Sequence, residues 1–297
     1  MTLSHGPSIG LGVLMGALAR VSMLRSDYRQ YPTYPHSYTS HLFLGFIAAL
    51  AGAVAIPALL EREWTAVTFF LIVSQQFREI RSMERDSLKA LEDSQLVTRG
   101  SDYIEDIART FEARYYIVIL VAAASSGGFE LSSIWTGLLC GTLAFLIGAL
   151  LMRQERLGDV VIVERASLNF READLYVGDV HIMNVGLRES REIIMKHGLG
   201  AILSAKNDTA RDTLANPGQR QAVLHDLGSI LGVRRELDTP EFTPQAKRDL
   251  KTGRVGVFIV PMEKDEGPFL EVLKRTPVLE SARGTALKSR AGRLARD

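Results

Sequence analysis

The chain has 297 residues, of which 46% are hydrophobic, and its 35 basic and 34 acidic side chains leave a formal net charge of +1. This balance excludes a protein that binds nucleic acid through bulk positive charge, and the hydrophobic content excludes a disordered chain. The single cysteine, Cys140, excludes an internal disulfide and lies inside an apolar run.

The first long apolar segment, residues 7–24, is long enough to cross a bilayer as a helix. No basic segment precedes it, so we expect a retained membrane span and not a cleaved signal peptide. Arg20, near its end, is expected to pair or to reach toward the lipid headgroups. Glycines at G-x-x-x-G spacing would let another helix approach closely, here or in a homo-oligomer, at Gly6, Gly10, Gly12 and Gly16.

Residues 24–41 are rich in tyrosine and proline, a composition typical of the headgroup region, and residues 42–60 form the second expected span. The short connection 61–63 makes the next span its antiparallel neighbour. Residues 64–77 are short for a crossing and include two glutamines. They are either completed by the polar helix that follows or enter the interior of a bundle.

The densely charged segment 74–114 is enclosed by apolar residues on both sides. Asp102 followed by Glu105 has the spacing of a capping box and predicts the start of a helix. An apolar stripe then recurs at helical spacing, at Tyr103, Ile107 and Phe111.

The opposite flank of this helix carries Glu105, Arg109 and Glu112. The plain interpretation is a solvated, salt-bridged face that contributes roughly 0.3–0.5 kcal/mol per pair. The alternative is a functional site, because the helix runs toward the membrane at Tyr115 and charged groups at the bilayer edge are costly unless they have partners.

Residues 115–124, a break at 125–128 and residues 134–152 predict a final hairpin of spans. Basic residues concentrate after the first span, between residues 78 and 114, and after the last span. Five crossings with the N-terminus outside place all three groups on one side, which the positive-inside rule assigns to the cytoplasm. The expected fold is therefore an α-helical membrane bundle of about five spans, residues 1–153, with cytoplasmic juxtamembrane helices at 74–114.

Residues 154–280 predict a small cytosolic α/β domain, because strand patterns at 159–164, 174–183, 201–204 and 255–260 alternate with helical patterns. The helical patterns are at 187–196, 218–231 and 267–275. Residues 281–297 predict a basic, disordered tail that would be attracted to anionic lipid.

Recognisable catalytic and nucleotide-binding motifs are absent from the sequence, and the histidines lack metal-ligand spacing. We therefore predict no metal site and assign no cofactor. The stretch at 178–186, GDVHIMNVG, is the most pocket-like, since Asp179 and His181 would share one face of a strand.

The hexad YIEDIA at residues 103–108 resembles the motif of the YIEGIA family, membrane proteins of endospore-forming Firmicutes, with Asp106 where that motif has glycine. Other stretches also resemble that family, namely residues 27–35, 41–50, 65–70, 75–81 and 111–114. The resemblance implies a link to sporulating bacteria and implies no substrate.

Three functions are compatible with these features. The first is a sensor or scaffold in the bacterial cell membrane, whose cytosolic domain binds a ligand or protein partner. The second is a protease-like, membrane-embedded hydrolase, with Glu105 and Glu112 and either His36 or His41 as acid, base or metal ligands. The third is a small transporter, which the short spans favour and the absence of a repeat disfavours.

Expected partners are membrane lipids, a cytosolic protein or small ligand, and a second copy of the chain, with no nucleic acid. The catalytic candidates are Glu105, Glu112 and His41. The candidate ligand or partner contacts are Tyr28, Arg29, Gln75, Gln76, Arg78, Tyr103, Arg109, Arg114, Asp179 and His181.

Overall fold

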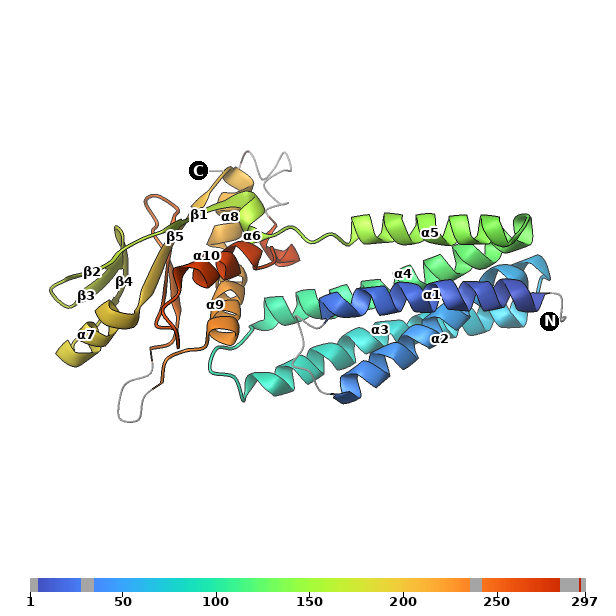
Figure 1. Cartoon of the computed structure of the whole chain (residues 1–297), viewed down its shortest axis with the longest axis horizontal. Helices are drawn as coiled ribbons and strands as arrows, with labels where there is room; N and C mark the ends of the chain where they lie inside the picture. Colours follow the sequence, from blue (N-terminus) through green and yellow to red (C-terminus); the bar gives the residue numbers. More distant parts are fainter. Residues whose placement is uncertain (1–4, 28–34, 236–241, 284–293, 295–297) are drawn as a thin grey trace. The chain divides into compact units, whose positions relative to one another are not determined.

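The computed structural model describes residues 5–27, 35–235, 242–283 and Leu294 (Figure 1). The chain divides into two compact units. The helical unit comprises Met1–Asp86 and Ile107–Arg153, and the α/β unit comprises Ser87–Asp106 and Gln154–Asp297. The sequence predicted residues 74–114 as part of the membrane half, whereas Ser87–Asp106 pack in the α/β unit.

Five long helices supply the helical unit (Figure 1). They are α1 (Gly6–Asp27), α2 (Pro35–Leu60), α3 (Trp64–Glu92), α4 (Ser101–Leu131) and α5 (Ile134–Leu151), and the division between units falls within α3 and α4. Within the described residues, three stretches are long and apolar enough to cross a membrane, namely Gly6–Leu24, Thr39–Leu60 and Ile134–Leu151. Their apolar composition is compatible with membrane association.

Small residues let these helices pack closely. A Cβ atom added at Gly16 would come within 2.7 Å of the Ala49 Cβ, and one added at Gly12 would come within 2.8 Å of the Ala53 Cβ. By contrast, an added Cβ at Gly6 or Gly10 would meet nothing within 4 Å. Gly12 and Gly16 therefore allow α1 to pack closely against α2 within this unit, as small residues do between packed helices.

The predicted break at residues 125–128 was wrong, because α4 continues through it to Leu131. A Cβ atom added at Gly128 would come within 2.8 Å of the Thr136 carbonyl oxygen, so this glycine permits close packing against α5. The Ser126 hydroxyl donates to the Ala53 carbonyl oxygen at 2.7 Å. Tertiary packing thus outweighs the low helix propensity of two serines and two glycines.

The α/β unit is built on a four-stranded antiparallel sheet of order β1-β5-β7-β6. Its strands are β1 (Val161–Arg165), β5 (Leu199–Ala205), β7 (Val255–Ile259) and β6 (Gln245–Arg248). The short helix α6 (Leu157–Val160) precedes β1, and the 3₁₀ helix η2 (Glu280–Ala282) follows α10 (Glu266–Arg275).

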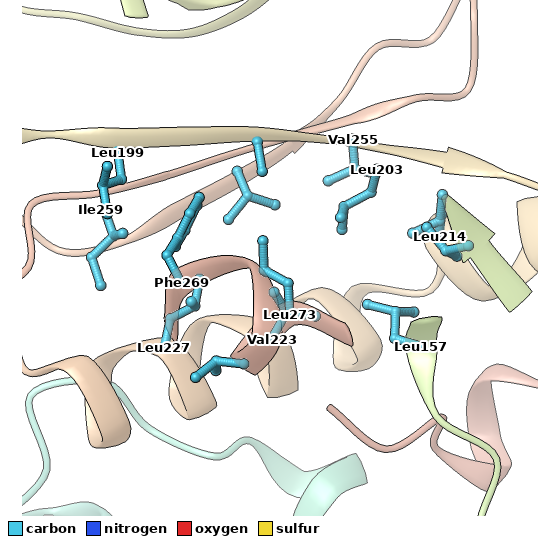
Figure 2. Close-up of a cluster of buried hydrophobic side chains, with 14 of the residues drawn as sticks. Leu157, Leu199, Leu203, Leu214, Val223, Leu227, Val255, Ile259, Phe269 and Leu273 are labelled. Atoms are coloured by element: carbon cyan, nitrogen blue, oxygen red, sulfur yellow. The ribbon is translucent and has the colours of Figure 1, made fainter. Parts of the chain in front are cut away.

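One face of this sheet packs against α8 (Asp208–Ala215), α9 (Pro217–Leu231) and α10 (Glu266–Arg275). Figure 2 shows the resulting core, with Leu203, Val255 and Ile259 from the strands above Leu227 and Phe269 from the helices. The apolar positions of the predicted strands and helices therefore meet in one cluster, as the patterning required.

The other face packs against a three-stranded meander and α7 (Arg188–His197). The meander consists of β2 (Leu168–Arg171), β3 (Asp174–Val177) and β4 (Val180–Asn184), and its core residues include Leu175, Val177 and Ile182.

The expected single strand at 174–183 is instead the β3–β4 hairpin, which turns at Gly178 and Asp179. Gly178 has φ +59°, the left-handed region that glycine adopts most readily at the first central position of a two-residue hairpin turn. Sequence patterning also missed β2 and β6, because each strand is only four residues long and mixes polar with apolar side chains. It missed α8 as well, whose sequence DTARDTLA is mostly polar.

Candidate functional site

Tyr103 attaches the start of α4 to α9 within the α/β unit. Its hydroxyl donates a hydrogen bond to Asp226 Oδ1 at 3.1 Å, and its ring meets His225 edge-on with centroids 6.0 Å apart. Tyr103 is only 6% exposed, as its position in the predicted apolar stripe requires. A buried phenol needs a partner, and the α9 carboxylate supplies it.

The residues just before α4 are held by the same helix. His225 Nδ1 lies 2.8 Å from the Val97 carbonyl oxygen, and the Gln221 side-chain amide donates to the Thr98 carbonyl oxygen at 2.6 Å. A Cβ atom added at Gly228 would come within 2.9 Å of the Val97 side chain. These residues, 97–106, therefore form a segment docked along α9, which we call the YIED segment.

Asp102 lies at the first turn of α9. Its Oδ2 accepts a hydrogen bond from the Ser281 hydroxyl at 3.0 Å, and a Cβ atom added at Gly218 would come within 2.7 Å of the Asp102 Cγ. Asn216 caps α9 by accepting from the Gln219 amide at 3.0 Å. A carboxylate at this position also interacts favourably with the positive end of the helix dipole.

Asp106, the residue that departs from the YIEGIA motif, is buried and bridges two distant segments. Its Oδ2 accepts from the Gln154 side-chain amide and its Oδ1 from the Glu280 backbone amide, both at 3.1 Å. The carboxylate therefore ties the YIED segment to the first residue of the C-terminal part and to η2. Glycine at this position would make neither contact.

Burial sets the charge states in this interface. Desolvation raises the pKa of Asp226 to about 6, even though the Tyr103 hydroxyl and the Thr276 side chain hydrogen-bond to it. Burial first, and then the Asp226 charge, raises the pKa of Tyr103 well above its usual value. Desolvation lowers the pKa of His225, which favours the neutral imidazole.

A second polar cluster lies inside the helical unit around His41. The His41 Nδ1 atom is 3.1 Å from the Tyr115 hydroxyl and 3.8 Å from Glu84 Oε1, and its ring stacks on Phe111 with centroids 5.0 Å apart. His41 therefore lies beside Glu84, a residue that no motif or spacing in the sequence points to. The pairing joins residues 43 apart on different helices, so no local pattern signals it.

Two buried arginines belong to the same unit. Arg20 is 1% exposed and its guanidinium lies 5.2 Å from the centre of the Tyr115 ring, so it does not reach outward as snorkelling would require. Arg114 is 5% exposed and lies 5.0 Å from the centre of the Phe111 ring. Both arrangements have cation–π geometry.

Glu112 bonds to neighbours on α3 and α4. Its Oε2 accepts from Arg81 at 3.4 Å and its Oε1 from the Tyr116 hydroxyl at 3.1 Å. Glu105 belongs to the α/β unit and is half-buried, whereas Glu112 and His41 belong to the helical unit. The three catalytic candidates are thus divided between the two units.

The remaining candidates are scattered. Tyr28 and Arg29 lie outside the described residues, as does the side chain of His36. The other candidates from residues 74–114 are exposed, namely Gln75, Gln76, Arg78 and Arg109.

The prediction that Asp179 and His181 share one face of a single strand was wrong. Asp179 occupies the hairpin turn and pairs with Arg254, while His181 lies 3.5 Å from Asp174 and 3.3 Å from the Lys247 Nζ atom. The turn at Gly178 breaks the strand alternation that would have placed both on one face. Across the residues that the structure describes, no group of histidine, cysteine, aspartate or glutamate side chains could hold a metal ion.

Asp226, Gln221 and Ser281 are the contact residues that sequence reasoning missed, because their partners lie 123 to 179 residues away in the chain. Only the polar residues on an otherwise apolar α9 hinted at a buried role.

Comparison with known proteins agrees with the resemblance of the motif. The family description "YIEGIA protein" matches residues 8–289. The chain is 44% identical over 271 residues to the uncharacterized protein YphB of Bacillus subtilis (strain 168), a match that covers 91% of each protein. No solved structure matches. This chain belongs to the YIEGIA family.

Proposed function

We propose that this protein is a multi-pass membrane sensor or scaffold that acts in sporulation, and that its cytosolic α/β unit binds a ligand or a protein partner. The observation that supports this most is the shared helix α4. Its first residues, Ser101–Asp106, pack in the α/β unit, and from Ile107 onward the same helix packs in the helical unit. A change at α9 or η2 would therefore act directly on a helix of the membrane part.

The proposed membrane arrangement has five crossings. The three apolar helices supply three of them, and α3 and α4 supply the other two. Large apolar side chains on α5, including Leu139, Leu146 and Leu150, are more than half exposed and would face lipid. The distribution of basic residues favours an external N-terminus and a cytoplasmic α/β unit.

Reporter fusions test this topology. Alkaline phosphatase fused after Ser132 should be active, and a fluorescent protein fused after Gln154 should fluoresce. Phosphatase activity after Gln154 would contradict the cytoplasmic assignment.

The functional test uses a spore-forming host that lacks its own copy of the gene and expresses this chain, with heat-resistant spores as the readout. Tyr103→Ala breaks the docked YIED segment and should abolish complementation. Glu105→Gln and Glu112→Gln keep the side-chain shape and should complement fully.

The opposite complementation pattern would distinguish the hydrolase from the sensor or scaffold. If the two glutamine variants are made and inserted at normal levels but fail to complement, the acid/base alternative replaces the scaffold. Elemental and small-molecule mass spectrometry of the purified full-length protein adds a second readout. A stoichiometric metal that is lost in His41→Gln would favour the hydrolase, and a bound organic ligand that is unaffected by these changes would favour the sensor.

A further inference from the structure

His5 lies between two carboxylates where three helices of the helical unit end or begin. It immediately precedes α1, Glu61 immediately follows α2, and Glu130 is the last residue but one of α4. The His5 Nε2 atom is 3.0 Å from Glu61 Oε1, and the Nδ1 atom is 2.8 Å from Glu130 Oε1. These three residues form the histidine clasp.

The protonation state of His5 decides how many contacts the clasp makes. A carboxylate only accepts hydrogen bonds, so both ring nitrogens must carry protons for both contacts to form. The neutral ring has one N–H and one lone pair, and the lone pair would then face a carboxylate at hydrogen-bonding distance. The arrangement in which His5 donates a hydrogen bond to each carboxylate therefore requires the imidazolium ion.

The neighbouring groups reinforce this assignment. The Ser8 hydroxyl bonds to Glu130 Oε1 and to the His5 carbonyl oxygen, which orients that carboxylate toward the ring. Apart from the clasp, the ionisable side chains next to it in the connection from α2 to α3 are Arg62 and Glu63, and both are exposed. α1 has no other ionisable residue before Arg20, and α5 has only Cys140.

The hydrogen bond to Glu130, opposed by desolvation and aided by the charges of Glu130 and Glu61, raises the pKa of His5 above 6.5. A raised folded-state pKa contributes stability that is fully present below pH 6.5. That contribution is lost as the pH rises through the raised value. The clasp thus loosens as the pH rises above 6.5, in the range where histidine switches operate.

We propose that the histidine clasp is a proton-binding site that holds the ends of α1, α2 and α4 together when His5 is protonated and releases them when it is neutral. Under the topology proposed above, the clasp faces the external medium. Because α4 carries Glu130 near one end and the YIED segment at the other, the ambient proton concentration acts on the helix that the α/β unit shares. The clasp does not depend on what that unit binds, so its failure would leave the proposed function standing.

The two tryptophans of the chain make the test direct. Trp64 begins α3 directly after the Glu61–Glu63 connection, and Trp135 is the second residue of α5, close to Glu130 in the chain. The experiment is a pH titration of tryptophan emission of the full-length protein in detergent, between pH 5 and pH 9. The wild-type emission should change with a midpoint above pH 6.5.

Glu130→Gln should lower this midpoint by about one pH unit, because an opposite charge is removed from the imidazolium. His5→Lys should hold the low-pH emission throughout, and His5→Gln should abolish the transition. His197→Gln, which alters a histidine of the α/β unit, is the matched control and should leave the midpoint unchanged.

A transition that persists in His5→Gln, or a midpoint that Glu130→Gln leaves unmoved, overturns the proposal. Helix content measured by circular dichroism identifies a variant that fails to fold. If His5→Gln fails, the midpoints of Glu130→Gln and Glu61→Gln decide, because each retains His5 and both must fall.

Discussion

The phenol of Tyr103 and the carboxylate of Asp226 are 3.1 Å apart, and their hydrogen bond joins the first turn of α4 to the middle of α9. Tyr103→Phe should destabilise the α/β unit by about 1–3 kcal/mol, because it leaves the Asp226 carboxylate without that donor. Thermal unfolding of the full-length protein would show a lower midpoint for this unit. An unchanged midpoint would mean that Asp226 is satisfied without Tyr103. Tyr176→Phe, which alters a half-exposed tyrosine on β3, is the control.

The same carboxylate makes stability depend on pH. Since the pKa of Asp226 rises from 3.8 to about 6 on folding, the folded state binds more protons between these values. The stability contributed by Asp226 therefore falls as the pH rises from about 4 to 6, by at most about 3 kcal/mol at 1.36 kcal/mol per unit.

Asp226→Asn should remove this loss, so the variant gains stability relative to the wild type as the pH is raised from 4.5 to 7. Asp249→Asn is the control with the opposite sign, because hydrogen bonds from Thr252 lower the pKa of Asp249. Parallel pH profiles for the wild type and Asp226→Asn would refute the assignment.

Gly218 leaves room for Asp102 at the start of α9. Gly218→Ala should push the Asp102 carboxylate away, since the new Cβ would lie 2.7 Å from the Asp102 Cγ. Loosening of the YIED segment should appear as faster tryptic cleavage at Arg99, which is buried in the wild type. Gly267→Ala, at the first turn of α10, meets its nearest atom at 3.4 Å and should leave the cleavage rate unchanged.

Asp106→Gly restores the YIEGIA motif and removes both bridging hydrogen bonds. It should also lower helix propensity by roughly 0.3 kcal/mol, since glycine ranks only slightly below aspartate. We expect faster hydrogen exchange at the Glu280 amide and in η2, with Asp106→Asn intermediate because it keeps one acceptor oxygen. Unchanged exchange at Glu280 would show that Gln219, which accepts from the Leu279 amide at 2.8 Å, holds this segment alone.

Gly16 and Gly10 provide a matched pair on α1. Gly16→Leu should disrupt the helical unit, because the Ala49 and Ala122 side chains lie within 2.7 and 3.1 Å of an added Cβ. Gly10→Leu has open space and should be tolerated. Thermal unfolding of the two variants in detergent distinguishes them, and equal unfolding midpoints would contradict the crossing of α1 with α2 and α4.

If a second copy of the chain packs at Gly10, Gly10→Leu should instead convert the oligomer to the monomer.

Several features followed from the sequence itself. Long apolar runs separate from alternating strand and helix patterns near residue 154, and the stripe of Tyr103, Ile107 and Phe111 is buried as its spacing predicts. These signals are local, because hydrophobic periodicity is repeated within one element and can be read without knowing its partners. The YIEDIA hexad likewise identified the family.

Only the tertiary structure decided where the YIED segment belongs. The partners of Asp102, Tyr103 and Asp106 include Ser281, Asp226 and Glu280, which are more than 120 residues away. Hydrogen bonds over such separations leave no periodic signal, since any polar residue on α9 or η2 would suit the pattern equally well. For the same physical reason His41 has Glu84 as an acidic neighbour, and His5 lies between Glu61 and Glu130. Sequence periodicity determines which faces are buried, whereas the packing of distant elements determines which charges meet.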